Sequence, residues 1–129
     1  VPGGSCNQSA VNLGFAKAGL GGLVPEFEVC GVLAPGSTAE FRLTNAAPFS
    51  LAYPVVGFVS LPLPFKGGFL VPNPPIILTP LPVNVVGSLI IPAVDGGLGP
   101  LVIVMQWGIV DSGATHGVSL SNALQITWL

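Results

Sequence analysis

Strict alternation of apolar and polar residues marks two segments of this chain as half-buried β-strands. Between Thr38 and Thr44 every second residue is apolar, and the charged residues Glu40 and Arg42 fall between them. Residues 26–29 alternate two glutamates with large apolar side chains in the same way. A period of two places successive side chains on opposite faces of a strand, whereas no helical period extends beyond a turn or two anywhere in the chain. Each segment therefore predicts a strand with one face on a core and the other in water.

Two segments near the C-terminal end carry a stronger apolar signal. Residues 101–110 are apolar on both faces, which predicts a strand in the centre of a sheet or one whose outer face is covered. Residues 119–129 alternate again, and Asn122 falls on the apolar side of that pattern. Because a buried amide needs hydrogen-bond partners, we expect Asn122 to find them inside the protein.

Turn signals and prolines define the rest of the fold. Ala34-Pro35-Gly36-Ser37 has Pro and Gly at the two central positions of a type II turn. Ten of the 14 prolines lie between Pro54 and Pro100, and since Pro cannot donate to a strand ladder, we expect edge strands and bulges there. Further short strands are expected at residues 10–15, 51–60, 69–71, 76–79 and 83–91. The sum of eight or nine short strands predicts an all-β fold, an antiparallel two-sheet β-sandwich without a substantial helix.

The 129 residues are enough for one domain with a real core. Residues 1–24 are rich in Gly and show little alternation, so we expect an N-terminal arm over 1–24 and a β-sandwich domain over 25–129. Residues 1–4 lack the basic start and apolar run of a signal peptide, so we expect this chain to be a processed form. The longest apolar stretch, residues 98–110, is interrupted by Gly, Pro and Gln and is too short for a membrane span.

Charge changes the picture more than any motif. Only eight residues are charged, three basic and five acidic, which is 6% of the chain against roughly 25% in an ordinary soluble domain. Half of the residues are apolar. Large exposed apolar patches mark interfaces, so we expect copies of the chain to associate; the alternative is a monomer covered with Ser, Thr and Asn. The three basic residues, Lys17, Arg42 and Lys66, are too few to form a phosphate-binding patch, which argues against nucleic acid as a partner.

Cys6 and Cys30 are the two cysteines, and they fit one disulfide. Closing a loop of about 25 residues would stabilise the fold by roughly 3.5 kcal/mol in the chain-entropy estimate. A disulfide indicates an oxidising, extracellular compartment; the alternative is a pair of buried free thiols. Cys30 falls on the glutamate side of its strand, so a bridge lies on that side or a bulge shifts the register. Two Cys and one His lack the number and spacing of metal ligands, so no metal site is expected.

Asp111, His116 and Ser119 or Ser121 are the only grouping with the residue types of a hydrolase. They lie in one loop and the start of one strand, without the Gly-x-Ser-x-Gly of a nucleophile elbow, and a His in such a loop is normally solvated. We therefore expect no enzymatic activity and no cofactor. Asp95-Gly96-Gly97 is expected to be a turn, because one carboxylate cannot provide the oxygen ligands of a calcium loop.

Asn7-Gln8-Ser9 has the form of an N-glycosylation site, which makes Asn7 a candidate for a glycan. A glycan would supply solubility that charge does not. Trp107 lies on an alternating apolar face and is expected in the core rather than on a sugar-binding face. Tyr53 and Trp128 are the candidate interface residues, the latter because it stands next to the C-terminal residue and could project into a neighbouring subunit.

Several phrases occur in an order that resembles a known domain. They are Phe41-x-Leu43-Thr44-Asn45-Ala46, Val56-Gly57-Phe58, Pro62-Leu63-Pro64-Phe65-x-Gly67-Gly68-x-Leu70-Val71-Pro72-x-Pro74, Gln106-Trp107 with Asp111, and Gly117-x-Ser119-x-Ser121-Asn122-Ala123-Leu124. Over residues 26–127 the chain resembles the C-terminal all-β domain of secreted proteins from planctomycete- and myxobacteria-like bacteria, a domain of uncharacterised function. The resemblance implies an extracellular β-sandwich and carries no catalytic residues. The chain departs from it at residues 83–87, where members often have a Thr-Asp pair. Since little precedes the matching region, we expect the domain to be the whole working unit.

Together these patterns predict an extracellular structural protein that self-assembles into a fibre, sheath or coat through apolar contacts between β domains. Its partners would be copies of itself, and residues 1–24 are the expected donor of a strand added between subunits. An adhesion or carbohydrate-binding module is the alternative, with glycans as partners. That alternative predicts exposed aromatic side chains beside polar groups, with Trp107 or Tyr53 among the contacts.

Overall fold

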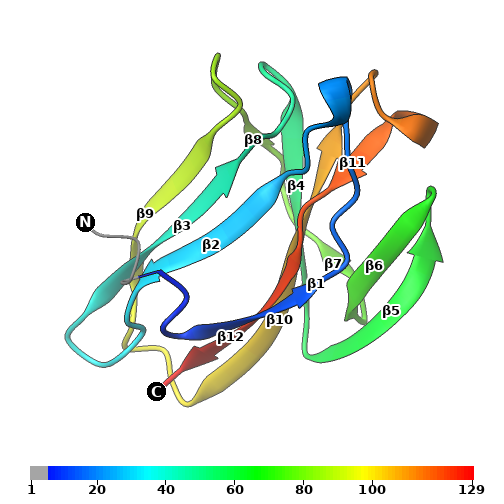
Figure 1. Cartoon of the computed structure of the whole chain (residues 1–129). Coiled ribbons are helices and arrows are strands. Elements are labelled where there is room, and N and C mark those ends of the chain that lie inside the picture. The colour runs from blue at the N-terminus through cyan, green and yellow to red at the C-terminus, as the bar shows by residue number, and fades with distance from the viewer. Residues whose placement is uncertain (1–5) are drawn as a thin grey trace.

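The alternating segments of the sequence form β-strands in the computed structural model, which describes residues 6–129 (Figure 1). Within that range the chain forms twelve strands, two short 3-10 turns and no α-helix. The strands are β1 (Ala10–Gly14), β2 (Glu26–Gly31), β3 (Thr38–Thr44), β4 (Leu51–Gly57), β5 (Val59–Phe65), β6 (Gly68–Asn73), β7 (Ile76–Ile77), β8 (Leu81–Pro82), β9 (Leu89–Asp95), β10 (Leu101–Val110), β11 (Val118–Leu120) and β12 (Ala123–Trp128), and the 3-10 turns are η2 (Leu20–Gly22) and η3 (Thr115–Gly117). Of these, β3 and β10 have the bounds predicted from the hydrophobic pattern.

The described strands pair antiparallel and form three sheets. The large sheet has the order β1-β12-β10-β4-β7, with β11 beside β10 and β8 beside β4. The small sheet has the order β2-β3-β9, and β5 and β6 form a two-stranded ribbon. The prediction of eight or nine strands in two sheets is therefore wrong in its count. Two of the predicted strands are each split in two. The segment 51–60 breaks at Phe58 into β4 and β5. The segment 119–129 breaks at Ser121 and Asn122 into β11 and β12.

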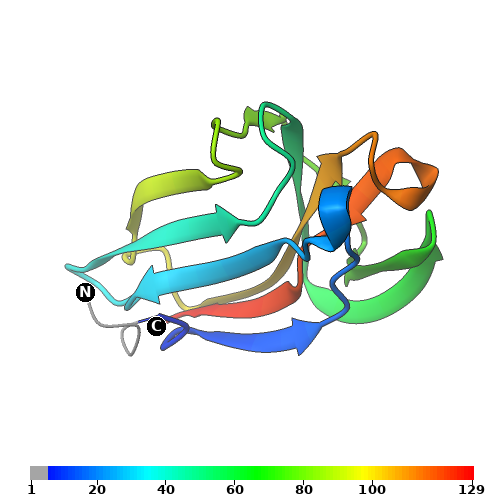
Figure 2. The same ribbon diagram turned by 45° about the horizontal axis from the view of Figure 1, so that its top comes forward.

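One apolar core lies between the small sheet and the large sheet, as in a β-sandwich (Figure 2). Phe27 on β2 meets Trp107 on β10 edge to face, with ring centroids 6.0 Å apart and an interplanar angle of 87°. Phe41 on β3 lies 6.3 Å from the ring of Trp128 on β12. Aromatic pairs of this kind add about 0.5–1.5 kcal/mol beyond the area they bury. These contacts hold the two sheets against each other.

The strand β10 is covered on both faces, as its sequence predicts. It lies between β12 and β4 in the large sheet. Its inner face carries Trp107 and Ile109, both buried in the core. On its outer face Val104 packs with Val71 of β6 and Ala123 of β12 in a second apolar cluster. The β5–β6 ribbon therefore forms a third layer on the outside of the large sheet.

The predicted strand over residues 83–91 is wrong for its first half. Residues 84–88 instead form a turn, because the side-chain Oδ1 of Asn84 accepts hydrogen bonds from the backbone N–H groups of Val86 and Ser88. The following Gly87 has a φ of +78°, a left-handed conformation that Gly adopts without strain. The hydrogen bonds to the Asn84 side chain thus outweigh the β propensity of Val85 and Val86. The ordered strand is β9, which begins only at Leu89.

The type II turn predicted at residues 34–37 is confirmed. Ser37 N–H donates to the carbonyl of Ala34 over 3.0 Å, and Gly36 has the positive φ, +82°, that the turn requires. This turn joins the β2 side of the small sheet to β3, so that the charged side chains of both strands lie on the outer face.

The segment predicted as an N-terminal arm contributes to the large sheet within its described residues, 6–24. Its strand β1 pairs with β12 from Ala10 opposite Ile126 to Gly14 opposite Ala123. β1 therefore belongs to the large sheet, although it lies before the boundary predicted at residue 24. Residues 1–5 of that prediction lie outside the described range. No helix in residues 6–129 has the length and hydrophobicity needed to cross a membrane.

Candidate functional site

The fold places Asp111 and Ser119 side by side against Gly19, but it gives the hydrolase-type residues no catalytic arrangement. Ser119 and Ser121 are completely buried, and Asp111 is nearly so. Ser121 Oγ accepts a hydrogen bond from the backbone N–H of Trp107, which makes it part of the core. His116 is exposed on η3, on the side of Gly67 in the β5–β6 turn, and no hydrogen bond joins it to either serine within the described residues. This grouping has no arrangement of nucleophile and base.

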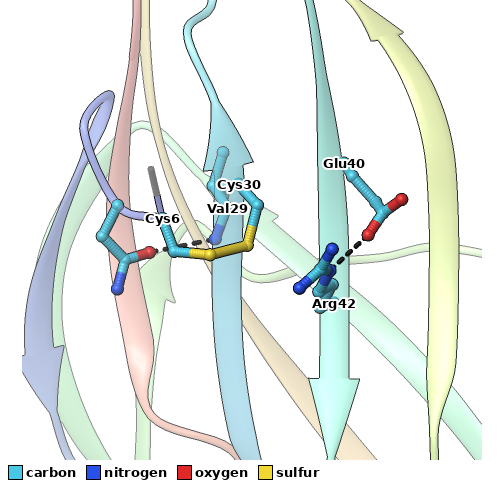
Figure 3. A network of polar contacts seen from close by, with 6 residues as sticks. Cys6, Val29, Cys30, Glu40 and Arg42 are labelled. Carbon is cyan, nitrogen blue, oxygen red and sulfur yellow. Dashed lines mark hydrogen bonds and ion pairs between the residues drawn. A yellow bond between two sulfur atoms is a disulfide. The ribbon is translucent and has the colours of Figure 1, made fainter. Parts of the chain in front are cut away.

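The disulfide predicted between Cys6 and Cys30 is present (Figure 3). Cys30 follows Glu28 on the outer side of β2, opposite Glu40 of β3, so the bridge lies on the glutamate side and no bulge intervenes. The Sγ atoms and a Glu28 carboxylate oxygen lie within 4.8 Å of one another. Because the disulfide occupies both sulfurs, Glu28 is the one group of this cluster left to interact with a ligand.

The free edge of β2 is closed by asparagine side chains. Asn122 Oδ1 accepts from the backbone N–H of Phe27 over 2.7 Å, and its Nδ2 donates to the Phe27 carbonyl over 3.1 Å. Asn7 Oδ1 accepts from the N–H of Val29 over 2.9 Å. Each amide thus bonds to β2 as the peptide group of a neighbouring strand would. The expectation that the buried Asn122 finds partners is confirmed.

These asparagines line a cavity of about 540 Å³ between β1 and β2, which we call the asparagine groove. Its lining comes from β1 of the large sheet, β2 of the small sheet and the segments that adjoin them. In Figure 2 β12 lies between β1 and β2. It is lined by Asn7, Asn12, Gly14, Ala16, Val24, Pro25, Glu26, Phe27, Glu28, Asn45 and Asn122. The groove therefore combines amides and carboxylates from segments that are far apart in sequence.

The aromatic candidates have different environments. Trp107 is 1% exposed, which confirms the core position and removes it from any sugar-binding face. Trp128 is 4% exposed, and its Nε1 donates to the carbonyl of Asp95 over 2.9 Å. Its ring therefore packs in the core rather than projecting from the surface as expected. Tyr53 is half-buried and lines an apolar cavity of about 240 Å³ beneath the β5–β6 ribbon.

The most exposed aromatic side chain among the described residues is Phe49, at 77%. It lies in the loop before β4. The backbone N–H of Phe49 donates to the carbonyl of Asn84, which lies in the loop before β9. That second loop exposes Val85 and Val86 to 63% and 74%. We call Phe49, Val85 and Val86 the apolar tip, since the two bonded loops present all three at one end of the molecule.

Two polar clusters were not anticipated from the sequence. Gln106, completely buried on the outer face of β10, bonds to the backbone of β6. The Lys17 ammonium donates to the carbonyls of Lys66, Thr115 and Val118. The first could have been suspected from a lone amide inside an apolar run, whereas nothing in the sequence near Lys17 indicates its partners.

Comparison of the chain with protein-family models, with curated proteins and with solved structures finds no match. The resemblance to the C-terminal domain of secreted bacterial proteins therefore stays a prediction from the residues that carry it.

Proposed function

We propose that this chain is an extracellular structural protein that self-assembles into a fibre, sheath or coat through apolar contacts between β domains. The observation that carries the proposal is the character of the surface. Among the described residues 22 large apolar side chains are exposed, whereas the whole chain has only eight charged residues. Patches of exposed apolar surface favour association, and a net charge of −2 opposes it only weakly.

The extracellular part of the proposal is supported by the Cys6–Cys30 disulfide, since such bonds persist in oxidising compartments. The resemblance over residues 26–127 supports the same location. That the chain belongs to this domain family is likewise part of the proposal.

Pairing through strand edges is restricted in this fold. The edge of β2 is closed by Asn7 and Asn122. The edge strand β9 has Pro92 within an irregular stretch of its ladder, and β7 is two residues long and follows Pro75. Such features protect edges from uncontrolled pairing, which leaves β1 as the open edge of the two packed sheets. Contacts between subunits would therefore depend mainly on side-chain packing.

The apolar tip is the contact we assign to one subunit. An apolar cavity of about 450 Å³ between β9 and β4, with Ile91, Val94 and Met105 in its lining and no charged residue, is the receiving surface on the next. Because tip and cavity are different surfaces, the contact is heterologous, and repeated heterologous contacts build an open array. Burial of side chains such as Phe and Val contributes about 1.5–3 kcal/mol each.

Sedimentation analysis of the disulfide-bonded protein at micromolar concentration tests the proposal. We expect species much heavier than the 13.0 kDa chain, and filaments by negative-stain microscopy. The double variant Phe49→Asp/Val86→Asp should dissociate them, because charge at the tip cannot enter an apolar cavity. Leu98→Asp/Val102→Asp, at two exposed apolar positions outside the tip and the cavity, is the matched control and should assemble normally. A stable wild-type monomer at this concentration would contradict self-assembly itself.

A further inference from the structure

The amides of the asparagine groove have fixed orientations. Backbone N–H groups can donate only to an oxygen, so the bonds from Val29 to Asn7 Oδ1 and from Gly14 to Asn12 Oδ1 determine which end of each amide is which. The Nδ2 group of Asn122 is used within the protein, where it donates to Phe27 O and to Asn12 Oδ1. The Nδ2 groups of Asn7 and Asn12 donate to no acceptor among the described residues. They are donors available to a ligand.

The groove also supplies acceptors. Glu26 and Glu28 stand two positions apart on β2 and both line the cavity. Neither makes an ion pair within residues 6–129, because the guanidinium of Arg42, opposite Glu28 in the ladder, pairs with Glu40 instead (Figure 3). Asn45 lines the same cavity from the end of β3 and is exposed, without a side-chain hydrogen bond in the described part of the chain.

This donor and acceptor set selects one class of ligand. Two carboxylates repel anions, and no basic residue among residues 6–129 lines the cavity to offset them. Oriented amide N–H donors beside carboxylates are matched by hydroxyl groups, each of which donates one hydrogen bond and accepts others. Pro25 and Val24 add apolar surface for the C–H face of a ring. The cavity volume of about 540 Å³ lies in the range of small-molecule sites, roughly 300–1,000 Å³.

We propose that the asparagine groove is a saccharide-binding site. It shares no lining residue with the apolar tip and does not depend on self-assembly. The sugar has two sources with the same chemistry: a free glycan, or a glycan carried by Asn7, which lines the groove and begins the Asn7-Gln8-Ser9 sequon. A free glycan places its hydroxyls on Glu28 and on the Nδ2 groups of Asn7 and Asn12. With an attached glycan, Asn7 Nδ2 is bonded to the first sugar, and Glu28 and Asn12 bind the hydroxyls.

Saturation-transfer NMR on the glycan-free, disulfide-bonded chain tests the site, because this method works for a monomer and for a large assembly alike. The probes are glucose, galactose, mannose and N-acetylglucosamine at millimolar concentrations. We expect saturable transfer to at least one of them. Glu28→Gln should weaken binding roughly tenfold, since a hydrogen bond to a charged group is lost. Asn45→Ala, an exposed position, should weaken it several-fold. Asp95→Asn, which removes a carboxylate outside the groove and keeps the oxygen that accepts from the N–H of Gly97, should leave it unaltered.

The second arm identifies the source of the sugar. If the native protein carries a glycan on Asn7, its intact mass exceeds that of an Asn7→Gln variant, and free sugar binds only to protein produced in a host that does not glycosylate it. If no glycan is attached, native and glycan-free proteins bind the sugar equally. Absence of saturable transfer from every sugar to the well-folded glycan-free chain overturns the proposal. Binding that survives both Glu28→Gln and Asn45→Ala overturns it as well, because it places the sugar elsewhere.

Discussion

The buried Gln106 gives the sharpest test of how the β5–β6 ribbon is held on the large sheet. Its Oε1 accepts from the N–H of Val71 over 2.9 Å, and its Nε2 donates to the carbonyls of Phe69 over 3.1 Å and Ser121 over 3.0 Å. A longer bond of 3.4 Å joins Nε2 to the carbonyl of Phe15. Gln106→Leu keeps a side chain of similar size and removes all four bonds; Phe15 is exposed, so water replaces its bond and three groups are left without partners. We expect this one substitution to destabilise the fold and to release the ribbon first.

The magnitude follows from the three groups left without partners. A buried backbone donor or acceptor that loses its partner costs about 1–3 kcal/mol, which gives roughly 3–9 kcal/mol for three. The ribbon can detach, however, so that the two β6 groups recover hydrogen bonds to water at the expense of the Val71–Val104 packing. We therefore expect a loss near the lower end, about 3–5 kcal/mol, which is a large share of the roughly 5–15 kcal/mol that stabilises a typical domain.

Denaturant unfolding and amide hydrogen exchange measure the two parts of this prediction. Gln106→Leu should lower the midpoint of unfolding, and the Val71 amide should lose protection while the amides of β12 keep more of theirs. Gln125→Leu is the matched control, because Gln125 is half-buried on β12 and makes no side-chain hydrogen bond in the described residues. A Gln106→Leu variant within about 0.5 kcal/mol of the wild type, the range of ordinary surface substitutions, would refute the reasoning.

Three further substitutions test other contacts. Replacing Cys6 and Cys30 with Ala should lower the free energy of unfolding by roughly 3.5 kcal/mol by the chain-entropy estimate, measured by denaturant titration against the oxidised wild type. Lys17→Met removes the donor shared by three carbonyls, so exchange of amides in the adjoining loops should accelerate with little change in the core. Gly19→Ala should lower the melting temperature sharply, because its Cβ would overlap a buried carboxylate, whereas Gly108→Ala, with 3.8 Å to the nearest atom, should melt close to wild type.

The strand interiors of this protein are predictable from sequence because alternation reports directly on burial. β3 and β10 have the expected bounds, and the two-sided apolar pattern of β10 correctly predicts a covered outer face. The pattern does not indicate which segment covers the outer face of β10. The ribbon that covers β10 comes from a proline-rich segment, and its attachment through Gln106 depends on contacts 35 and 37 residues away in sequence.

Local side-chain chemistry and position along the chain account for two of the errors. The valines at 85 and 86 favour a strand, but Asn84 bonds to the backbone that follows it and closes a turn. Trp128 stands next to the last residue, yet its indole N–H reaches the carbonyl of Asp95, so nearness to the end of the chain did not imply exposure. In both cases hydrogen bonds of a single side chain decide the outcome, and the hydrophobic pattern carries no information about them.

The asparagine groove could not be predicted, because its lining residues come from strands whose proximity is set by topology. Asn7, Asn12, Asn45 and Asn122 have no common spacing in the sequence. Of these, only Asn7 and Asn122 gave a signal, the first as part of a sequon and the second as an amide on an apolar face. The position of Asn122 indicated that its amide needs hydrogen-bond partners, but it did not indicate that these partners are on the edge of β2.

Neutral groups in this chain perform a task that charged residues perform in many β proteins. Sheet edges are commonly protected by lysines and other charges. Here the amide of Asn122, from the segment before β12, covers the edge of β2, and the edge strand β9 carries Pro92. Edge protection without charge prevents random pairing of strands and leaves apolar side chains such as Phe49 exposed. Asn122→Leu should therefore change the mode of association rather than its extent, because it frees the Phe27 peptide for intermolecular pairing. We expect irregular, thioflavin-positive aggregates from that variant and ordered assemblies from the wild type. Identical ordered assemblies from both proteins would show that the amide does not protect the edge.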